Sequence, residues 1–194
     1  NIMKKIKKAL ISVSDKKKLK DLLKVLTKHK IELISSGGTY KEIRKLRFKC
    51  LEVSEYTGSP EILGGRVKTL HPKIHAGILS KRNNSSHTQD LKKNNFEEID
   101  LVIVNFYPFE KTLEQTNNHL KIIENIDVGG PTMVRAAAKN YSDVTVITSS
   151  DQYGELINEI ENNKGSTSIK FREKMSLEAF SETAYYDAVI SNYF

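Results

Sequence analysis

The sequence predicts an α/β protein with a doubly wound, mainly parallel sheet and a C-terminal helical extension. Short apolar runs alternate along the chain with segments of helical periodicity. Several of these runs are apolar on both faces, which is typical of strands covered by helices on both sides. After Gly165 a single helical pattern continues to the end, with no strand expected. We therefore expect a domain over residues 1–164 and a helical extension over 165–194 that leads toward a further domain.

The strands are predicted at the apolar runs 9–13, 31–34, 48–53, 101–106 and 144–148. The first helix follows the first strand, with Ser14 or Asp15 as its expected cap, and its leucines form one stripe: Leu19, Leu22, Leu23 and Leu26. Later helices are predicted at 39–46 and 119–124, from Pro131 and after Ser150. Residues 83–86 are interpreted as an exposed loop.

The amino-acid composition excludes several classes of protein. The chain has 194 residues, 38% of them hydrophobic, 28% charged and only one of them Cys, which excludes collagen, mucins, disulfide scaffolds and disordered tails. The longest apolar run, 101–104, is far shorter than the roughly 20 residues that a bilayer span needs, and no secretion signal is recognised. We expect a cytoplasmic protein without a membrane partner.

The net charge of +7 is unevenly distributed. Residues 1–50 carry 16 Lys and Arg against 4 Asp and Glu, whereas the remaining residues carry 15 against 20. No aromatic residues interleave with the lysines, as a stacking platform for nucleic acid would need. We interpret the basic segment as the solvated face of the first helix and expect no nucleic-acid partner.

Paired glycines indicate an anion site. Three pairs occur, at 37–38, 64–65 and 129–130. The segment 36–39 follows a predicted strand and opens a helix, as a phosphate cradle does, although tight turns would also need glycine. Neither G-x-G-x-x-G nor G-x-x-x-x-G-K-[ST] is present, so a monophosphate is favoured over a dinucleotide or a triphosphate.

Hydroxyl and ammonium groups end the first predicted strand. Ser12, Ser14 and Lys16 would complete an anion site at the same edge of the sheet. The alternative is that the hydroxyls are only helix caps. The segment 64–72 adds Arg, Lys, Thr and His side chains in one loop, where surface charges and a local hydrogen bond are the alternative.

Two further segments carry groups suited to proton transfer. Asn105 and Tyr107 close the most apolar strand, where a phenol is either a ligand contact or an aromatic plug. Asp127 precedes a helix that bears Arg135 and Lys139 among alanines. A lysine in such surroundings has a lowered pKa and exchanges protons with a nearby acid, but a capping Asp on an Ala-rich helix is the simpler reading.

No metal site or nucleophilic triad is predicted. Of the five histidines only His71 and His75 are four residues apart, and the segment between them is interpreted as a loop rather than a metal-binding helix. There is no G-x-S-x-G elbow. Cys50 lies inside an apolar run, where a thiol packs without reacting.

Seven segments, in fixed order, resemble one known family: 12–16, 36–39, 64–72, 75–79, 105–109, 127–130 and 135–140. Over residues 8–194 the chain resembles the N-terminal IMP cyclohydrolase domains of the PurH family of bifunctional purine biosynthesis proteins. The resemblance implies a methylglyoxal-synthase-like fold. It implies ring closure of 5-formamidoimidazole-4-carboxamide ribotide (FAICAR) to inosine monophosphate (IMP) with loss of water, without metal or organic cofactor. Transformylase activity would belong to a larger C-terminal domain and is not expected in this chain.

The resemblance also implies roles for individual residues. The phosphate and ribose would be held by Ser12, Ser14, Lys16, Ser36, Gly37, Gly38, Thr39, Arg66 and Thr69. The base would be bound and transformed by Lys68, Asn105, Tyr107, Asp127, Gly129, Gly130 and Lys139. Our hypothesis is that Lys68 and Tyr107 act on the formamide oxygen, that Lys139 with Asp127 moves protons, and that Asn105 and Gly129 fix the carboxamide. The sequence leaves open which lysine is the base.

Two other functions remain as alternatives. One is a methylglyoxal-synthase-like lyase acting on a triose phosphate. The other is a non-catalytic, allosteric nucleotide-binding module of the same fold. An effector site needs anion contacts but no proton shuttle, so the amines, phenol and acid favour the enzyme. The expected partners are a purine ribotide monophosphate and a second copy of the chain in a homodimer.

Overall fold

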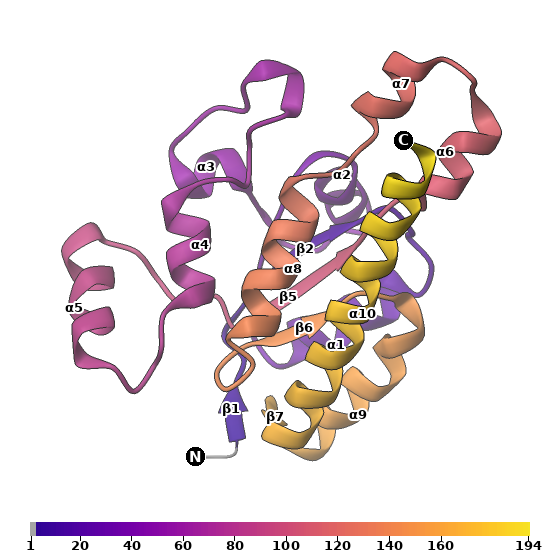
Figure 1. The fold of residues 1–194 in the computed structure, drawn as a ribbon. Coiled ribbons are helices and arrows are strands. Elements are labelled where there is room, and N and C mark those ends of the chain that lie inside the picture. Colours follow the sequence, from indigo (N-terminus) through magenta and orange to yellow (C-terminus); the bar gives the residue numbers. More distant parts are fainter. Residues whose placement is uncertain (1–2) are drawn as a thin grey trace.

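A parallel five-stranded sheet forms the centre of the molecule (Figure 1). A computed structural model describes residues 3–194. The strand order is β4-β3-β2-β5-β6, with bounds β2 Lys8–Val13, β3 Glu32–Ser35, β4 Leu51–Glu52, β5 Leu101–Asn105 and β6 Thr145–Ile147. The five predicted strands and their parallel pairing are therefore confirmed. The third is shorter than predicted at both ends, since residues 48–50 are not part of β4 and α3 (Val53–Thr57) begins at the last residue of that apolar run.

Both faces of the central strands are covered. Ala9, Leu10 and Ile11 of β2 are all completely buried, as predicted for a strand that is apolar on both faces. The strand order reverses direction between β2 and β5, since β3 and β4 extend from one side of β2 and β5 and β6 from the other. In doubly wound sheets, ligands bind outside the carboxyl ends of the strands at such a reversal.

Connecting helices lie where the sequence predicted them at 19–28, 37–45, 119–124, 129–139 and 153–162. The helices at 53–57, 72–79, 85–94 and 109–115 were not predicted. The bounds of the helices are α1 Leu19–Lys28, α2 Gly37–Lys45, α4 Pro72–Leu79, α5 Ser85–Asn94, α6 Phe109–Gln115, α7 His119–Glu124, α8 Gly129–Lys139, α9 Tyr153–Asn162 and α10 Ile169–Tyr193. Short 3-10 helices occupy Leu63–Gly65 and Ser150–Gln152. The leucine stripe of α1 is buried as predicted.

Three local predictions are wrong. Neither Ser14 nor Asp15 caps α1: the Asp15 carboxylate accepts from the Lys17 N–H at 2.9 Å, and the helix begins only after Lys18. Residues 83–86 are not a loop, because Asn84 caps α5, which starts at Ser85. The segment between His71 and His75 is not a loop either, since it opens α4.

A strand follows Gly165, which the sequence analysis did not expect. β7 (Ser166–Ser168) pairs antiparallel with β1 (Met3–Lys5), with Lys4 opposite Thr167. Both strands are short and polar, so they lack the apolar run that signals a strand. This small sheet joins the beginning of the described chain to the start of α10.

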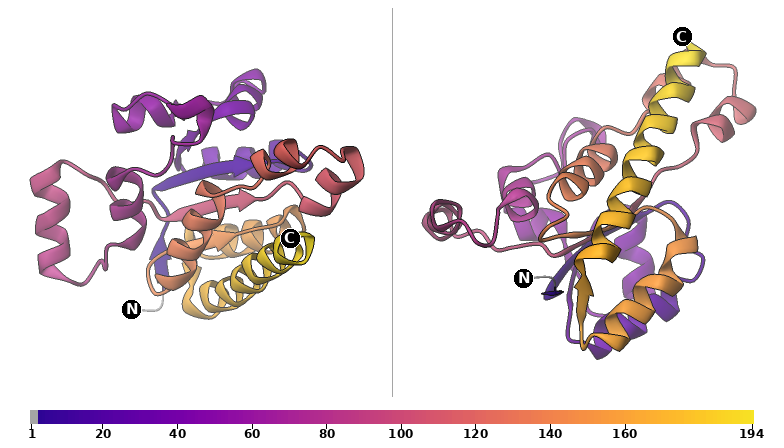
Figure 2. Two further views of the ribbon diagram at one scale, coloured as in Figure 1. Left: turned by 45° about the horizontal axis from the view of Figure 1, so that its top comes forward. Right: turned by 60° about the horizontal axis from the view of Figure 1, so that its bottom comes forward.

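Helix α10 confirms the predicted C-terminal helix. It lies beside α8 and contacts β6, and its far end runs past the sheet to α6 (Figure 2). Its buried residues are Phe171, Arg172, Met175, Ser176, Ala179, Thr183 and Tyr186. Phe180 and Ala184 of the same helix are exposed. The boundary after residue 164 stays a prediction, but apolar side chains of α10 belong to the same hydrophobic cluster as the sheet.

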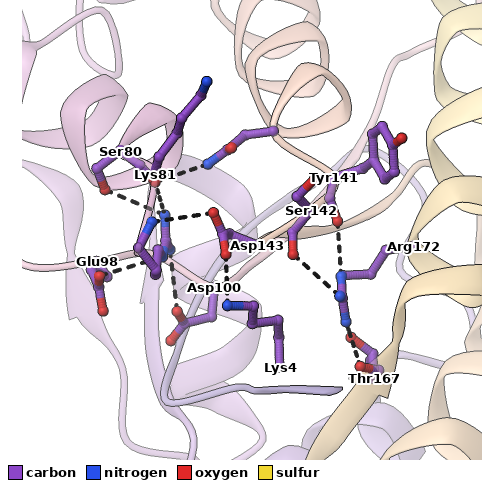
Figure 3. Close-up of polar contacts among 12 residues, drawn as sticks. Lys4, Ser80, Lys81, Glu98, Asp100, Tyr141, Ser142, Asp143, Thr167 and Arg172 are labelled. Carbon is purple, nitrogen blue, oxygen red and sulfur yellow. Dashed lines mark hydrogen bonds and ion pairs between the residues drawn. The ribbon is translucent and has the colours of Figure 1, made fainter. Parts of the chain in front are cut away.

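Arg172 anchors α10 through backbone oxygens (Figure 3). Its side chain is fully buried, and burial lowers its pKa. Nε donates to the Tyr141 carbonyl at 2.8 Å, a second nitrogen to the Ser142 carbonyl at 3.2 Å, and a third to the Thr167 carbonyl. One guanidinium thus joins α10 to β7 and to the chain that leaves α8.

Within residues 3–194, none of the helices combines the length and the apolar composition required to cross a bilayer.

Cys50 is a buried free thiol, and burial raises its pKa to about 12. The prediction that Cys50 packs without reacting is consistent with this, since the thiolate is the reactive form.

Candidate functional site

The predicted site residues gather at the carboxyl edge of β2 and β5. Two adjoining cavities there, of about 680 and 300 Å³, share Ser12, Lys68, Asn125 and Asp127. Every predicted site residue except Lys139 lines one or both. The larger includes Arg66, Thr69, Gly129 and Gly130, and the smaller includes Ser14, Lys16, Ser36, Gly37, Gly38, Thr39, Asn105 and Tyr107.

The amino terminus of α2 forms one wall of the smaller cavity. Ser36 precedes the helix in an extended conformation, and its side chain does not cap it. Gly37 has a φ of 56°, which side chains rarely adopt, and the Lys68 Nζ would lie 3.9 Å from a Cβ added there. Free backbone N–H groups and a nearby ammonium are the elements of an anion site.

Thr39 joins this helix to the end of β2. Its Oγ1 accepts from the Val13 N–H at 3.0 Å and donates to the Val13 carbonyl at 3.1 Å. The Lys16 ammonium donates to the same carbonyl, and burial lowers the pKa of Lys16. Thr39 therefore fixes the shape of the cradle with its side chain, whereas its backbone N–H lies in the first turn of α2.

Asn105 organises the loop that follows β2. Its Oδ1 accepts from the Ser14 N–H at 2.8 Å, the Ser14 hydroxyl at 2.9 Å and the Asp15 N–H at 3.1 Å. Val13 and Asn105 are opposite each other in the parallel pairing, which brings these groups together. Among residues 3–194 no acceptor receives the Asn105 amide N–H groups, so they remain available to a ligand.

The two glycines at the start of α8 line the larger cavity and allow close contacts there. A Cβ on Gly129 would lie 2.7 Å from the Thr69 Oγ1, and one on Gly130 would lie 2.3 Å from the Asp127 Oδ2. The Gly130 N–H donates to the Asp127 Oδ1 at 2.9 Å. Glycine is needed here for space, since neither residue has a positive φ.

Tyr107 and Arg66 lie at the rim. Tyr107 is 40% exposed, and its hydroxyl accepts from the Gln115 amide at 2.7 Å, so it is not the buried plug of the alternative interpretation. The Arg66 Nε donates to Glu124 at 3.1 Å across the larger cavity. This hydrogen bond lowers the pKa of Glu124 and raises that of Arg66. An anionic ligand would have to compete with Glu124 for Arg66.

Lys139 lies elsewhere, so the hypothesis that Lys139 and Asp127 form a proton-transferring pair is not supported within one chain. Lys139 is exposed in the last turn of α8, whereas Asp127 precedes the first turn. At roughly 1.5 Å per residue the helix separates the two ends by about 15 Å. Lys139 lines a separate cavity with Arg135 and Phe180.

Sequence reasoning missed Asn125 and Tyr186, which also line the smaller cavity. Tyr186 comes from α10, and its hydroxyl accepts from the Asp127 N–H at 2.9 Å. Helical periodicity from the buried Ala179 and Thr183 was the signal that could have found it. In the described part of the chain, no three His, Cys, Asp or Glu side chains lie close enough to hold a metal ion.

Comparisons with known proteins agree with this arrangement. A family model described as MGS-like domain matches residues 18–132, and one described as AICARFT/IMPCHase bienzyme matches residues 137–194. The bifunctional purine biosynthesis protein PurH of Bradyrhizobium diazoefficiens is 47% identical over 190 residues, covering 98% of this chain. PurH of Rippkaea orientalis is 52% identical over 188 residues, covering 96%. The chain spans 36% of the length of each relative.

A solved structure has the same fold over nearly all of the chain. The crystal structure of ForH superimposes with a TM-score of 0.85 at 30% sequence identity, covering 95% of both chains. The first family model covers β3, β4 and β5 and the site residues from Ser36 to Gly130, and the second covers β6, α9 and α10. The resemblance read from the sequence motifs is confirmed, and the chain belongs to the family of MGS-like domains.

Proposed function

We propose that the chain is an IMP cyclohydrolase, which closes FAICAR to IMP with loss of water. One observation carries the proposal: a cavity at the reversal of strand order combines an anion cradle with an amine, a phenol and a carboxylate. The similarity to proteins named PurH supports the same activity. An effector site would need only the cradle.

The proposed mechanism assigns the ends of the cavity to the ends of the substrate. The phosphate binds at the N-terminus of α2, next to Lys16, and the base reaches Lys68 and Asp127. The carboxamide nitrogen attacks the formyl carbon, which forms the N–C bond and places negative charge on the formyl oxygen. Lys68 and Tyr107 stabilise that charge, and Asp127 takes one proton from the carboxamide nitrogen and passes it to the formyl oxygen. The formamide nitrogen loses the second proton to the same oxygen. The C–O bond breaks as the C=N bond of the ring forms, and the oxygen leaves as water.

The wild-type chain is expected to convert FAICAR to IMP without added metal or organic cofactor. The conversion is followed by ultraviolet absorbance, and the product is identified by chromatography. The same protein preparation tests the two alternatives. A lyase would release inorganic phosphate from a triose phosphate, and an effector module would bind IMP without converting FAICAR. Absence of IMP formation by folded protein would refute the proposal.

Finer parts of the proposal concern the assembly. We infer a cytoplasmic homodimer that binds no nucleic acid and has no transformylase activity. The dimer is supported by apolar side chains exposed around the separate cavity of α8 and α10, where Leu79, Leu177 and Phe180 are 39%, 69% and 40% exposed. Light scattering of the purified chain checks the dimer, and an AICAR formylation assay checks the activity.

Lys16→Ala is expected to raise KM about tenfold while lowering kcat much less, because a charge-assisted contact to the phosphate is lost equally in ground and transition states. Lys20→Ala on the exposed face of α1 is the matched control and should keep the wild-type KM. Steady-state kinetics with FAICAR measure both. A drop in kcat alone would show that Lys16 does not bind the phosphate.

A further inference from the structure

Tyr186 brings an unassigned hydroxyl into the candidate site from a distant part of the chain. Its ring is 5% exposed and packs on Phe106, directly after β5, with the ring centroids 4.9 Å apart. Tyr186 lines the smaller cavity together with Lys68, Asn105 and Asp127, and its hydroxyl lies 2.9 Å from the backbone nitrogen of Asp127. The side chain belongs to α10, which Arg172 anchors.

The Tyr186 hydroxyl accepts a hydrogen bond, but among the described residues it donates none. A phenol has one O–H donor and an oxygen that accepts. The oxygen accepts from the Asp127 backbone N–H at 2.9 Å. Over the residues that the structure describes, no acceptor receives the Tyr186 proton. Burial is the main cause that raises the pKa of Tyr186, with the Asp127 and Asp187 carboxylates adding to it, so the phenol keeps its proton at neutral pH.

The direction of this donor is fixed. Packing on Phe106 holds the ring, and the bond from a backbone N–H holds the oxygen. A donor held in this way needs no reorganisation when charge develops near it, which is the condition for electrostatic catalysis. Tyr107 differs, because it is exposed and its hydroxyl is bound by the exposed side chain of Gln115.

We propose that the Tyr186 hydroxyl contacts the substrate and donates its hydrogen bond to a carbonyl oxygen of the base. The inference rests on the proposed function and deepens it. The phosphate is the less suitable acceptor, because the Asp127 carboxylate beside Tyr186 repels it and the cations of the cradle attract it. A neutral donor suits a neutral carbonyl oxygen.

The carbonyl in question is the carboxamide oxygen, which becomes the ring carbonyl of IMP. When the carboxamide nitrogen gives its proton to Asp127, negative charge spreads from that nitrogen onto this oxygen, and the charge moves to the formyl oxygen as the N–C bond forms. The Tyr186 O–H stabilises that charge and returns to an ordinary hydrogen bond in the product. Tyr186 itself gains and loses no proton, and the formyl oxygen leaves as water.

The test compares two ligands and two variants. IMP carries the ring carbonyl, and purine riboside 5′-monophosphate lacks it but keeps the ribose and phosphate. Tyr186→Phe keeps the ring and removes the hydroxyl, and Tyr185→Phe removes the neighbouring exposed hydroxyl, which bonds to Glu110 outside the cavity. Isothermal titration calorimetry gives Kd for each pair, and thermal melting verifies that each variant is folded.

We expect Tyr186→Phe to weaken IMP about tenfold and to weaken purine riboside 5′-monophosphate less than threefold, the difference being the hydrogen bond to the carbonyl. We also expect kcat for FAICAR to fall more than KM rises. Tyr185→Phe should match the wild type with both ligands.

An equal loss of affinity for both ligands would overturn the inference, because it would mean that the hydroxyl only positions Asp127. That result leaves the proposed function intact if the wild type forms IMP. A wild type that binds IMP but never forms it from FAICAR would refute the proposed function instead, whereas the ligand comparison would still decide the contact.

Discussion

Arg172→Met is expected to lower the free energy of unfolding by about 3 kcal/mol. Methionine keeps most of the apolar volume of the side chain but leaves the carbonyls of Tyr141, Ser142 and Thr167 without the guanidinium. The hydrogen bond to Thr167 is buried, whereas those to Tyr141 and Ser142 are partly buried. A buried carbonyl that loses its partner costs about 1–3 kcal/mol and a partly buried one costs less, while removal of a desolvated charge offsets part of the sum. The loss should therefore be one of the largest for any single substitution in the chain.

Equilibrium unfolding in urea, followed by circular dichroism, measures this effect. Lys170→Met is the matched control, since Lys170 is exposed on the same helix two residues away. It should unfold at the wild-type urea concentration. If Arg172→Met also kept the wild-type midpoint, the buried guanidinium would not be what holds α10 against β7 and the end of α8.

The strands and helices that the sequence predicted well are those with strong apolar patterns. The run at 101–104 became the buried strand β5, and the leucine stripe became the buried face of α1. β1 and β7 were missed because each has only three residues and no apolar run, so they are specified by pairing with each other and not by local pattern. α5 was missed because Asn and Ser, which we took as loop residues, are also helix caps.

The candidate site shows the same division. Motifs that end strands were placed correctly, because the carboxyl ends of parallel strands meet at one edge. Hydrogen bonds between residues far apart in the sequence were not predictable. Arg66 bonds to Glu124, 58 residues away, and Asp127 bonds to Tyr186, 59 residues away. Lys139 was assigned to the site by resemblance, but the length of α8 separates it from Asp127.

Gly130→Ala is expected to lower kcat for FAICAR closure about 100-fold. The new Cβ would lie 2.3 Å from the Asp127 Oδ2 and 3.0 Å from its Cγ, so the carboxylate must move. A displacement of about 1 Å in a reacting group costs a factor of this size. Stability should change little, because Ala favours the helix by about 1 kcal/mol over Gly and the loss of the Asp127 hydrogen bond costs a similar amount.

Gly154→Ala is the matched control. Gly154 lies in the first turn of α9, and a Cβ there would meet nothing within 4 Å. This variant should keep the wild-type kcat, which separates displacement of Asp127 from a general effect of replacing a helical glycine. Stopped-flow or steady-state absorbance with FAICAR measures kcat for both variants.

A double variant decides whether Gly130 acts through Asp127. Asp127→Asn alone should lower kcat by at least as much as Gly130→Ala, because it removes the proposed proton acceptor. If both act on one carboxylate, Asp127→Asn combined with Gly130→Ala should be no slower than Asp127→Asn alone. If the double variant were slower than Asp127→Asn by the full factor seen for Gly130→Ala alone, the two substitutions would act independently. Gly130 would then contribute to catalysis in another way, such as through its backbone N–H, and the need for glycine there would not be explained by Asp127.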